Sequence, residues 1–323
     1  MRILAVLLVI AVLIAAGGYF AYNFLINLQP PELVEIRSGW GEVTHKTSEV
    51  HTKIVINNPN RISISIGNLV LNYTIKMNGI PVAEGYKKGI KINHGLNVVE
   101  LTTIINNSII PEWFKTHVEN GEETKIEIIP EASVDLKFLK LTPNIPEFSH
   151  ILKTNLLSSL NSREKIEVGS GGVTLVEIRE RRASWGKAID NEVPLDISLL
   201  LYNPNLIPIT IPRIEFNVRM NDIEMIVGES TDYIVLEPKK EKEIRLTAYL
   251  NSENLDDWWV SHINNGEFTE INAEIEMMFN IGSKELPMRV LDCVSTLKTD
   301  ILNPTGITES SKPECSPPKE VVK

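Results

Sequence analysis

The chain repeats itself at a distance of 145 residues, and this repeat constrains its fold more than any other feature. Trp40-Gly41 recurs as Trp185-Gly186, and Leu33–Arg37 recurs letter for letter as Leu175–Arg179 with a three-residue offset. Other matches pair Asn58-Pro59-Asn60 with Asn203-Pro204-Asn205, Trp113 with Trp258, His117 with His262, Asn120-Gly121-Glu122 with Asn265-Gly266-Glu267, and Lys153-Thr154 with Lys298-Thr299. So many matches in one register predict two tandem copies of one domain.

A length of 323 residues suits two domains of about 100–150 residues each. We expect the first domain at 30–160, a linker at 161–172 and the second domain at 173–307. The linker contains Gly-Ser-Gly-Gly, which indicates a flexible connection because no Gly-Lys-Ser/Thr of a phosphate loop follows it. The tail at 308–323 carries Ser, Pro and Lys residues and is predicted to be disordered.

Each copy has the alternation of a β-protein. Apolar residues alternate with others around Leu195–Tyr202, and Ile62, Ile64 and Ile66 are separated by serines, which predicts half-buried strands. Asn78-Gly79 and Asn221-Asp222 lie where hairpins should turn. One helix per copy is predicted at 111–120 and 255–265. The fold class is therefore all-β, with two tandem two-sheet sandwiches that each carry one short helix.

The first thirty residues form an apolar segment. No charged residue occurs from Ile3 to Pro31, and the apolar part would span about 36 Å as a helix, enough to cross a bilayer. We expect residues 1–29 to be a single-pass transmembrane anchor. Arg2 before it and Glu32 after it favour a cytoplasmic N-terminus and extracytoplasmic domains. The alternatives are a cleaved signal peptide, favoured by the small residues at 15–18, and a buried core helix.

Charge and composition exclude several classes of function. A net charge of −10 argues against nucleic acid and against an electrostatic grip on anionic lipid. The six histidines lack metal-ligand spacing, and no nucleophile elbow occurs, so we expect no metal, no cofactor and no enzyme. Cys293 and Cys315 either form a disulfide that closes the tail onto the second domain or stay free. Asn72 and Asn106 lie in glycosylation sequons that matter only outside the cytoplasm.

Three further features can each be interpreted as structural or as ligand-binding. His117 and His262 are packing residues of the helices or ligands. Trp113, Trp258 and Trp259 lie in the core or stack on sugars. The charge run that holds Arg179, Arg181 and Arg182 is a solvated strand edge or a patch for an anionic ligand. In all three cases the structural interpretation is favoured.

The Asn-Pro-Asn motif and its context indicate a protein family. Proline cannot donate a ladder bond, and asparagine can bond its own backbone, so Asn58-Pro59-Asn60 and Asn203-Pro204-Asn205 should end one strand and begin another. With a Trp-bearing helix downstream, the sequence resembles the water-stress and hypersensitive-response (WHy) domain of group 2 late embryogenesis abundant (LEA) proteins. The resemblance covers about residues 32–160 and 173–307. It implies a fibronectin-like sandwich and a non-catalytic role in desiccation or osmotic stress.

An anchor followed by two such domains resembles a prokaryotic, in particular an archaeal, arrangement of that family. Only the six Asn-Pro-Asn residues carry over, and we interpret them as structural rather than ligand-binding. The predicted function is a membrane-anchored protector or binder of envelope components or proteins. The alternatives are a constitutive structural or adhesion module of the envelope and a protein that binds lipid or another apolar ligand.

Overall fold

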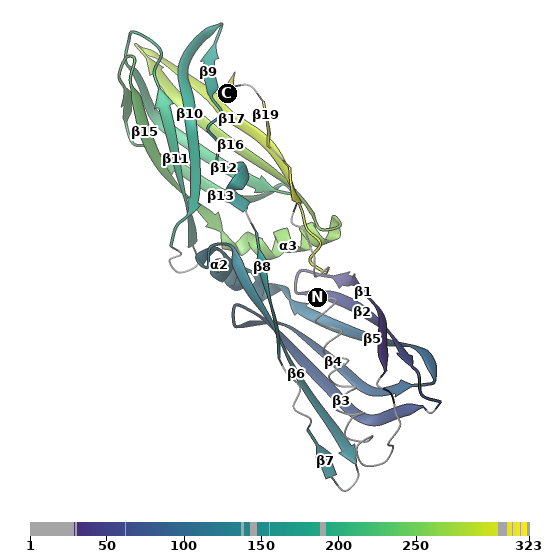
Figure 1. Ribbon diagram of the computed structural model, residues 1–323. Helices are drawn as coiled ribbons and strands as arrows, with labels where there is room; N and C mark the ends of the chain where they lie inside the picture. The colour runs from purple at the N-terminus through teal and green to yellow at the C-terminus, as the bar shows by residue number, and fades with distance from the viewer. Residues whose placement is uncertain are drawn as a thin grey trace. The chain divides into compact units, whose positions relative to one another are not determined.

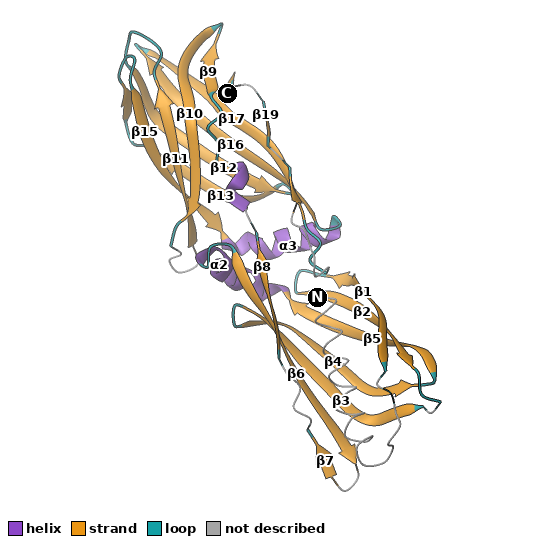
Figure 2. Ribbon diagram, viewed as in Figure 1, coloured by secondary structure: helices purple, strands orange, loops and turns teal. Residues whose placement is uncertain are grey.

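The computed structural model describes residues 29, 31–61, 63–136, 139–142, 147–154, 156–187, 192–302, 309–311, 313–316 and 318–321. The described chain is mostly antiparallel strand, with two α-helices (Figure 1; Figure 2). It divides into two compact units. The first is built mainly from residues up to His117 and from Glu123–Lys153, and the second mainly from Val118–Glu122 and Thr154–Thr299.

The first unit is one curled sheet. Its strands run in the order β1-β2-β5-β4-β3-β6-β7, with β8 also paired to β6. Only four residue pairs join β4 to β5, so the sheet bends there into two layers. The strands are β1 (Glu32–Val43), β2 (Thr47–Asn58), β3 (Ile64–Met77), β4 (Ile80–Ile92), β5 (Gly95–Asn106), β6 (Glu123–Leu136), β7 (Leu139–Leu141) and β8 (Phe148–Lys153), and η1 (Asn107–Ile109) leads into the helix α2 (Ile110–Glu119).

Both layers of the first unit contribute alternate residues to one core. In β2, for example, Ile54 and Ile56 are buried while the residues between them are more exposed, as a strand with one face inward requires. Burial of these apolar side chains stabilises the sandwich. The core consists of Ile36, Ile54, Ile56, Leu69, Leu71, Tyr73, Ile90, Ile92, Val99, Leu101, Ile128 and Ala132.

The second unit has the same order of elements. Its sheet runs β18-β17-β16-β12-β13-β15-β11-β10-β9, and only two residue pairs join β13 to β15, so it also bends there. The main strands are β9 (Ile166–Ser170), β10 (Val173–Trp185), β11 (Glu192–Tyr202), β12 (Ile209–Met220), β13 (Ile223–Ser230), β14 (Ile234–Leu236), β15 (Glu241–Asn251), β16 (Phe268–Ile281) and β17 (Lys284–Lys298). The helices are η2 (Leu156–Ser159), η3 (Ser252–Asn254) and α3 (Leu255–Asn264), and the short strands are β18 (Glu309–Ser310), β19 (Glu314–Cys315) and β20 (Lys319–Glu320).

The predicted turns and helices are confirmed. Asn78 and Gly79 have φ values of 52° and 83° between β3 and β4, and Asn221 and Asp222 have 51° and 63° between β12 and β13. Positive φ at both central residues is the geometry that a tight hairpin needs. The helices α2 and α3 begin and end within one residue of the expected positions.

The structure differs from expectation at the linker and the tail. Within 161–172, β9 pairs with β10, and Gly171 and Gly172 form the hairpin turn with φ values of 60° and 80°. Within 308–323, the described strands β18, β19 and β20 pair along β17. The first segment pairs with the strand that follows it, and the tail pairs with the edge of β17, because open strand edges bind further strands.

Strand pairing shows which residues of the two units are equivalent, without the three-residue offset of the repeated Leu33–Arg37 segment. Ile36 lies opposite Ile54, and Arg181 lies opposite Leu199, which is 145 residues further along than Ile54. Ile36 and Arg181 are therefore equivalent in the sheet, and the verbatim recurrence of Leu33–Arg37 does not mark equivalent positions. In the first unit, β3 extends from Ile64 to Met77, well beyond the short alternating segment around Ile62, Ile64 and Ile66.

The expected N-terminal anchor falls on residues of which 1–28 lie outside the described part of the chain. Among the residues that the structure describes, no helix combines the length and apolar character needed to cross a membrane.

Substitution of Gly85 can test how tightly the core of the first unit is packed. The Cβ of an alanine at position 85 would lie 1.9 Å from Cζ of Tyr73, which faces Gly85 across the β3–β4 pair. Tyr73 is buried and hydrogen bonds to Thr103, with 2.7 Å between Oη and Oγ1, so it cannot move without loss. We expect Gly85→Ala to lower the free energy of unfolding by about 1–3 kcal/mol in a denaturant titration.

The matched control is Gly39→Ala in β1, because a Cβ there has no heavy atom within 4 Å. It should leave the free energy of unfolding nearly unchanged. Equal effects of the two substitutions would show that Tyr73 does not pack on Gly85.

Candidate functional site

The first Asn-Pro-Asn asparagine of the second unit is wholly enclosed. Asn203 has no exposed surface, and its Nδ2 donates to the carbonyl oxygens of Ile207 at 2.8 Å and Leu236 at 3.0 Å. Its Oδ1 accepts the backbone N–H of Asn205 at 2.9 Å, which closes a turn over Pro204. The side chain therefore links the end of β11 to the chain that enters β12 and to the end of β14.

The second asparagine of the motif binds a different strand. Nδ2 of Asn205 donates to the carbonyl oxygens of Thr174 at 3.1 Å and Leu175 at 2.8 Å, both in β10. It also reaches Oδ1 of Asn203 at 3.1 Å. Together the two amides supply donors to four backbone carbonyls at a point where the proline supplies none.

The first unit repeats this arrangement with small changes. Nδ2 of Asn58 donates to the carbonyl of Ile92 at 3.4 Å, and Oδ1 accepts the N–H of Asn60 at 3.0 Å. Asn60 exchanges two hydrogen bonds with the backbone of Gln29, at 2.7 and 2.9 Å. Nδ1 of His94 lies 2.9 Å from the carbonyl oxygen of Asn60. These side chains form hydrogen bonds within the protein, and a structural rather than ligand-binding role for the motif stays a prediction.

A second buried polar cluster lies beside the helix of the second unit. Nε1 of Trp258 donates to Oγ1 of Thr269 at 3.0 Å, and Nδ1 of His262 lies 2.7 Å from the same oxygen. Nε2 of His262 lies 2.8 Å from Oγ1 of Thr299, which donates to Oε2 of Glu267 at 3.0 Å. We call these five residues the helix network. It joins α3, the start of β16 and the end of β17.

The direction of each hydrogen bond in the helix network follows from the donors present. The carboxylate of Glu267 can only accept, so Thr299 must donate to it and must accept from Nε2 of His262. Burial favours the neutral imidazole, and with Nε2 as its donor Nδ1 accepts from the hydroxyl of Thr269, which in turn accepts from Trp258. The neutral ring of His262 therefore has its proton on Nε2.

Burial keeps His262 neutral. The residue is 1% exposed, and this burial lowers its pKa from 6.5 to about 4. Neither threonine hydroxyl carries a negative charge that would offset the cost of burying a protonated imidazole. A histidine of this kind suits a fixed scaffold better than proton transfer near neutral pH.

Residues 113–154 make contacts that correspond to those of the helix network. In the first unit, Nε1 of Trp113 donates to Oγ1 of Thr124 at 2.9 Å, and Nδ1 of His117 lies 2.8 Å from that oxygen. In the second unit, Oε2 of Glu122 accepts from Oγ1 of Thr154 at 2.8 Å. Each of these positions is 145 residues before its partner in the helix network.

Sequence reasoning found part of this cluster. It placed Trp113, Trp258, Trp259, His117 and His262 in packing roles, and all five side chains are buried. It missed the threonines and glutamates that bond to them. The signal was present, because Asn-Gly-Glu and Lys-Thr recur in register. Glu122 and Glu267 have φ values of 61° and 60°, so each follows its glycine in the left-handed conformation.

The two sequon asparagines lie in different surroundings. Asn72 is exposed within β3. Asn106 is exposed too, but its Oδ1 accepts from the backbone N–H and the hydroxyl of Ser108, at 3.2 and 2.8 Å. Asn106 thereby caps η1, as Asn251 caps η3 through Glu253. Glycan occupancy at either residue stays a prediction.

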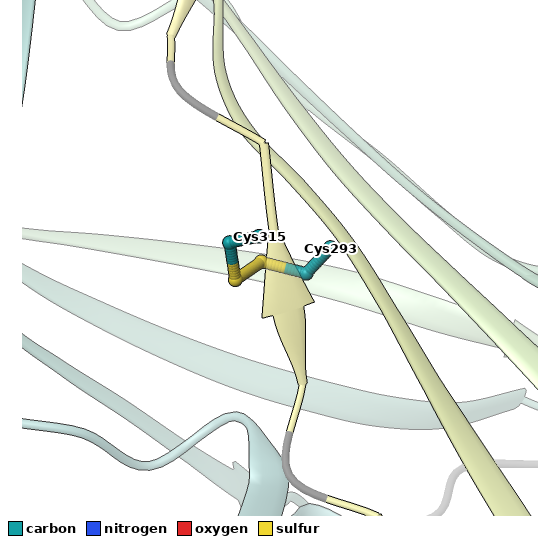
Figure 3. Close-up of a disulfide and its surroundings, with 2 residues drawn as sticks. All are labelled: Cys293 and Cys315. Carbon is teal, nitrogen blue, oxygen red and sulfur yellow. A yellow bond between two sulfur atoms is a disulfide. The ribbon is translucent and has the colours of Figure 1, made fainter.

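Cys293 and Cys315 are joined as a disulfide (Figure 3). They face each other in the β17–β19 pair, so the bond attaches the described part of the tail to the second unit. Among the described residues, no group of three or more His, Cys, Asp or Glu side chains is placed to hold a metal ion.

One family model matches the chain. Residues 198–290 match the model described as "Late embryogenesis abundant protein". The match begins in β11, includes Asn203 and all of α3, and ends in β17. It supports the family for this segment of the second unit. No curated protein matches the chain.

Several solved structures are similar to parts of the chain. A protein from Archaeoglobus fulgidus is 27% identical over 39% of this chain and 100% of its own, with a TM-score of 0.33. A protein from Arabidopsis thaliana is 16% identical over 40% and 84%, with a TM-score of 0.27. A putative β-galactosidase from Bacteroides fragilis is 8% identical over 78% and 33%, with a TM-score of 0.23. Scores this low carry no argument about function.

The buried asparagine of the second unit can be tested by substitution. Asn203→Ala removes both donors to the carbonyls of Ile207 and Leu236. We expect the free energy of unfolding to fall by about 2–4 kcal/mol, measured by denaturant titration, because buried carbonyls lose their partners. Asn217→Ala, which removes an exposed amide in β12, is the control and should have little effect. Similar losses for both variants would contradict the role given to Asn203.

The pKa of His262 makes stability depend on pH. The unfolded chain binds a proton near pH 6.5 and the folded protein only near pH 4, so acid favours unfolding. The stabilisation from neutral His262 is complete above pH 6.5, is lost as the pH falls toward 4, and amounts to about 3 kcal/mol at most. Denaturant titrations between pH 4 and 7 measure it.

The control is His262→Gln, which keeps one donor and one acceptor but does not titrate. Its free energy of unfolding should fall less steeply between pH 6.5 and 4 than that of the parent. Parallel curves would mean that His262 has an ordinary pKa and that other groups cause the acid response.

Proposed function

We propose that this chain is a stress-associated, non-catalytic protein of the late embryogenesis abundant type. It acts by binding or shielding proteins or envelope components during desiccation or osmotic stress. The observation that carries the proposal is the family match over residues 198–290. The segment contains Asn203, Trp258 and His262, whose polar atoms are engaged inside the fold. Such a domain offers its outer surface, rather than a reactive cluster, to other molecules.

We extend the family to the first unit as a second copy of the domain. The hydrogen bonds of Trp113 and His117 to Thr124 correspond to those of Trp258 and His262 to Thr269, 145 residues later. Asn58 and Asn203 make the same turn over a proline. Two copies would double the contact surface without a new binding mode.

We also propose that residues 1–29 anchor the protein in the cell membrane, with the N-terminus in the cytoplasm and both units outside. The absence of charge between Ile3 and Pro31 supports this arrangement. Attachment would keep the two units at the membrane surface when water is withdrawn. A net charge of −10 would oppose association between neighbouring copies under those conditions.

The test is survival of a strain that lacks the gene, compared with its parent, after drying and after hyperosmotic shock. We expect survival to fall under stress only and to be restored by the full-length gene. A gene without codons 2–29 serves as the matched variant and should restore survival poorly if attachment matters.

Two outcomes would contradict the proposal. Equal survival of the two strains would remove the stress role. Poor growth in every condition would favour a constitutive structural role in the envelope instead.

A further inference from the structure

Arg181 lies on the buried face of the sheet, where apolar side chains are usual. Its residue is 9% exposed, and it lies opposite Leu199, which is 1% exposed, in the β10–β11 pair. Directly opposed residues of neighbouring strands point to the same face of a sheet, so Arg181 shares the inner face with Leu199. Nη1 of Arg181 is buried and has no hydrogen-bond partner among the residues that the structure describes.

The neighbouring arginines differ from Arg181 in this respect. Nη1 of Arg179 lies 2.5 Å from Oε1 of Glu241, and its guanidinium lies 3.7 Å from the ring centre of Tyr202. Nη2 of Arg182 lies 2.9 Å from Oε2 of Glu180. Carboxylates are therefore plentiful along this strand, yet they pair with the outward arginines. Burial lowers the pKa of Arg181, and the charge of Glu164 offsets this only in part.

The first unit shows that the sandwich does not need an arginine here. Ile36 lies at the equivalent position opposite Ile54 and belongs to the hydrophobic core. The pairing register of both strands also shifts just before this position, between Leu33 and Glu35 in β1 and between Ile178 and Glu180 in β10. The β1–β2 and β10–β11 pairings are thus equivalent here, although β10 also has a neighbour on its other side.

A buried cation without a full set of partners is unfavourable in the free protein. A guanidinium presents its N–H groups as a planar fork that matches the oxygens of a carboxylate or phosphate. We infer that Arg181 is a binding site in the second unit for an oxyanion group of a small ligand. This inference does not rest on the proposed stress function.

The surroundings favour a ligand whose oxyanion is attached to an apolar body. On the same inner face, Ile178 and Leu201 are wholly buried beside Leu199. The segment between η2 and β9 is joined to β10 here by an isolated bridge between Ser162 and Arg181, with N–O distances of 3.0 and 2.8 Å. Asn161 and Arg163 of the same segment add hydrogen bonds to Ala183 and Glu180, so this segment borders Arg181 along the edge of β10.

The experiment uses the full chain in lipid nanodiscs, with empty nanodiscs as the blank. Sodium octanoate, sodium acetate and inorganic phosphate are titrated by calorimetry and in thermal melts. We expect at least one probe to bind and to raise the melting temperature of the second unit. Octanoate alone would assign an anionic amphiphile, and acetate or phosphate would assign a free ion, and each supports the site.

The variants are Arg181→Ile, which copies the first unit, and Arg181→Met, which keeps the length of the side-chain stem. Each should weaken binding by about tenfold or more and should melt no lower than the parent without ligand. The control is Arg182→Gln, which removes an exposed charge one residue away and should bind normally.

Three results would overturn the inference. One is that none of the three probes binds the parent protein at millimolar concentration. Another is that Arg181→Ile and Arg181→Met bind as well as the parent. The last is that both variants melt far below the parent without ligand, because Arg181 would then have a structural partner within the protein.

Discussion

The architecture of each unit depends on the amide side chain that replaces missing backbone donors where the chain leaves one strand for the next. At the end of β11 the chain turns through a proline, which has no N–H, while the carbonyls of Ile207 and Leu236 are drawn inward. A buried carbonyl without a donor is costly, and Asn203 supplies both donors from one side chain. Asn205 then binds β10, so a single tripeptide fixes three neighbouring segments. Alanine or serine in place of Asn203 could not reach both carbonyls.

The helix network applies the same physics at another point of the second unit. Trp258 and His262 bring a large apolar surface to α3, and each also has an N–H that cannot be buried alone. Thr269 resolves this by accepting from the indole and donating to the imidazole. The last acceptor of this series of hydrogen bonds is Glu267, whose carboxylate accepts from Thr299. Glu267 follows Gly266 in the left-handed backbone conformation. A fully connected network of this kind fixes a geometry and leaves little freedom for chemistry.

The sequence was sufficient for the features that depend on local patterns. Alternation gave strands such as β11, and Asn-Gly with its counterpart Asn-Asp gave the hairpin turns. It was insufficient where a partner decides the outcome. The segment at 161–172 looks like a linker until β10 is available to pair with β9, and the tail needs the free edge of β17. Thr269 looks like an outward residue of an amphipathic strand and Thr299 like a residue beyond a strand end, because alternation alone does not reveal which polar side chain faces a buried tryptophan or histidine.

Arg181 shows how one irregular step in a strand changes the chemistry of a unit. Strict alternation from the buried Ile178 would turn Glu180 and Arg182 inward and Arg181 outward. The register shift between Ile178 and Glu180 reverses that phase, so Arg181 enters the core while its neighbours keep their ion pairs in solvent. The first unit has the equivalent shift but carries Ile36, whose burial only adds to the hydrophobic core. Equivalent strand pairs therefore carry an apolar core residue in one unit and a buried cation in the other, and the two units need not have the same function.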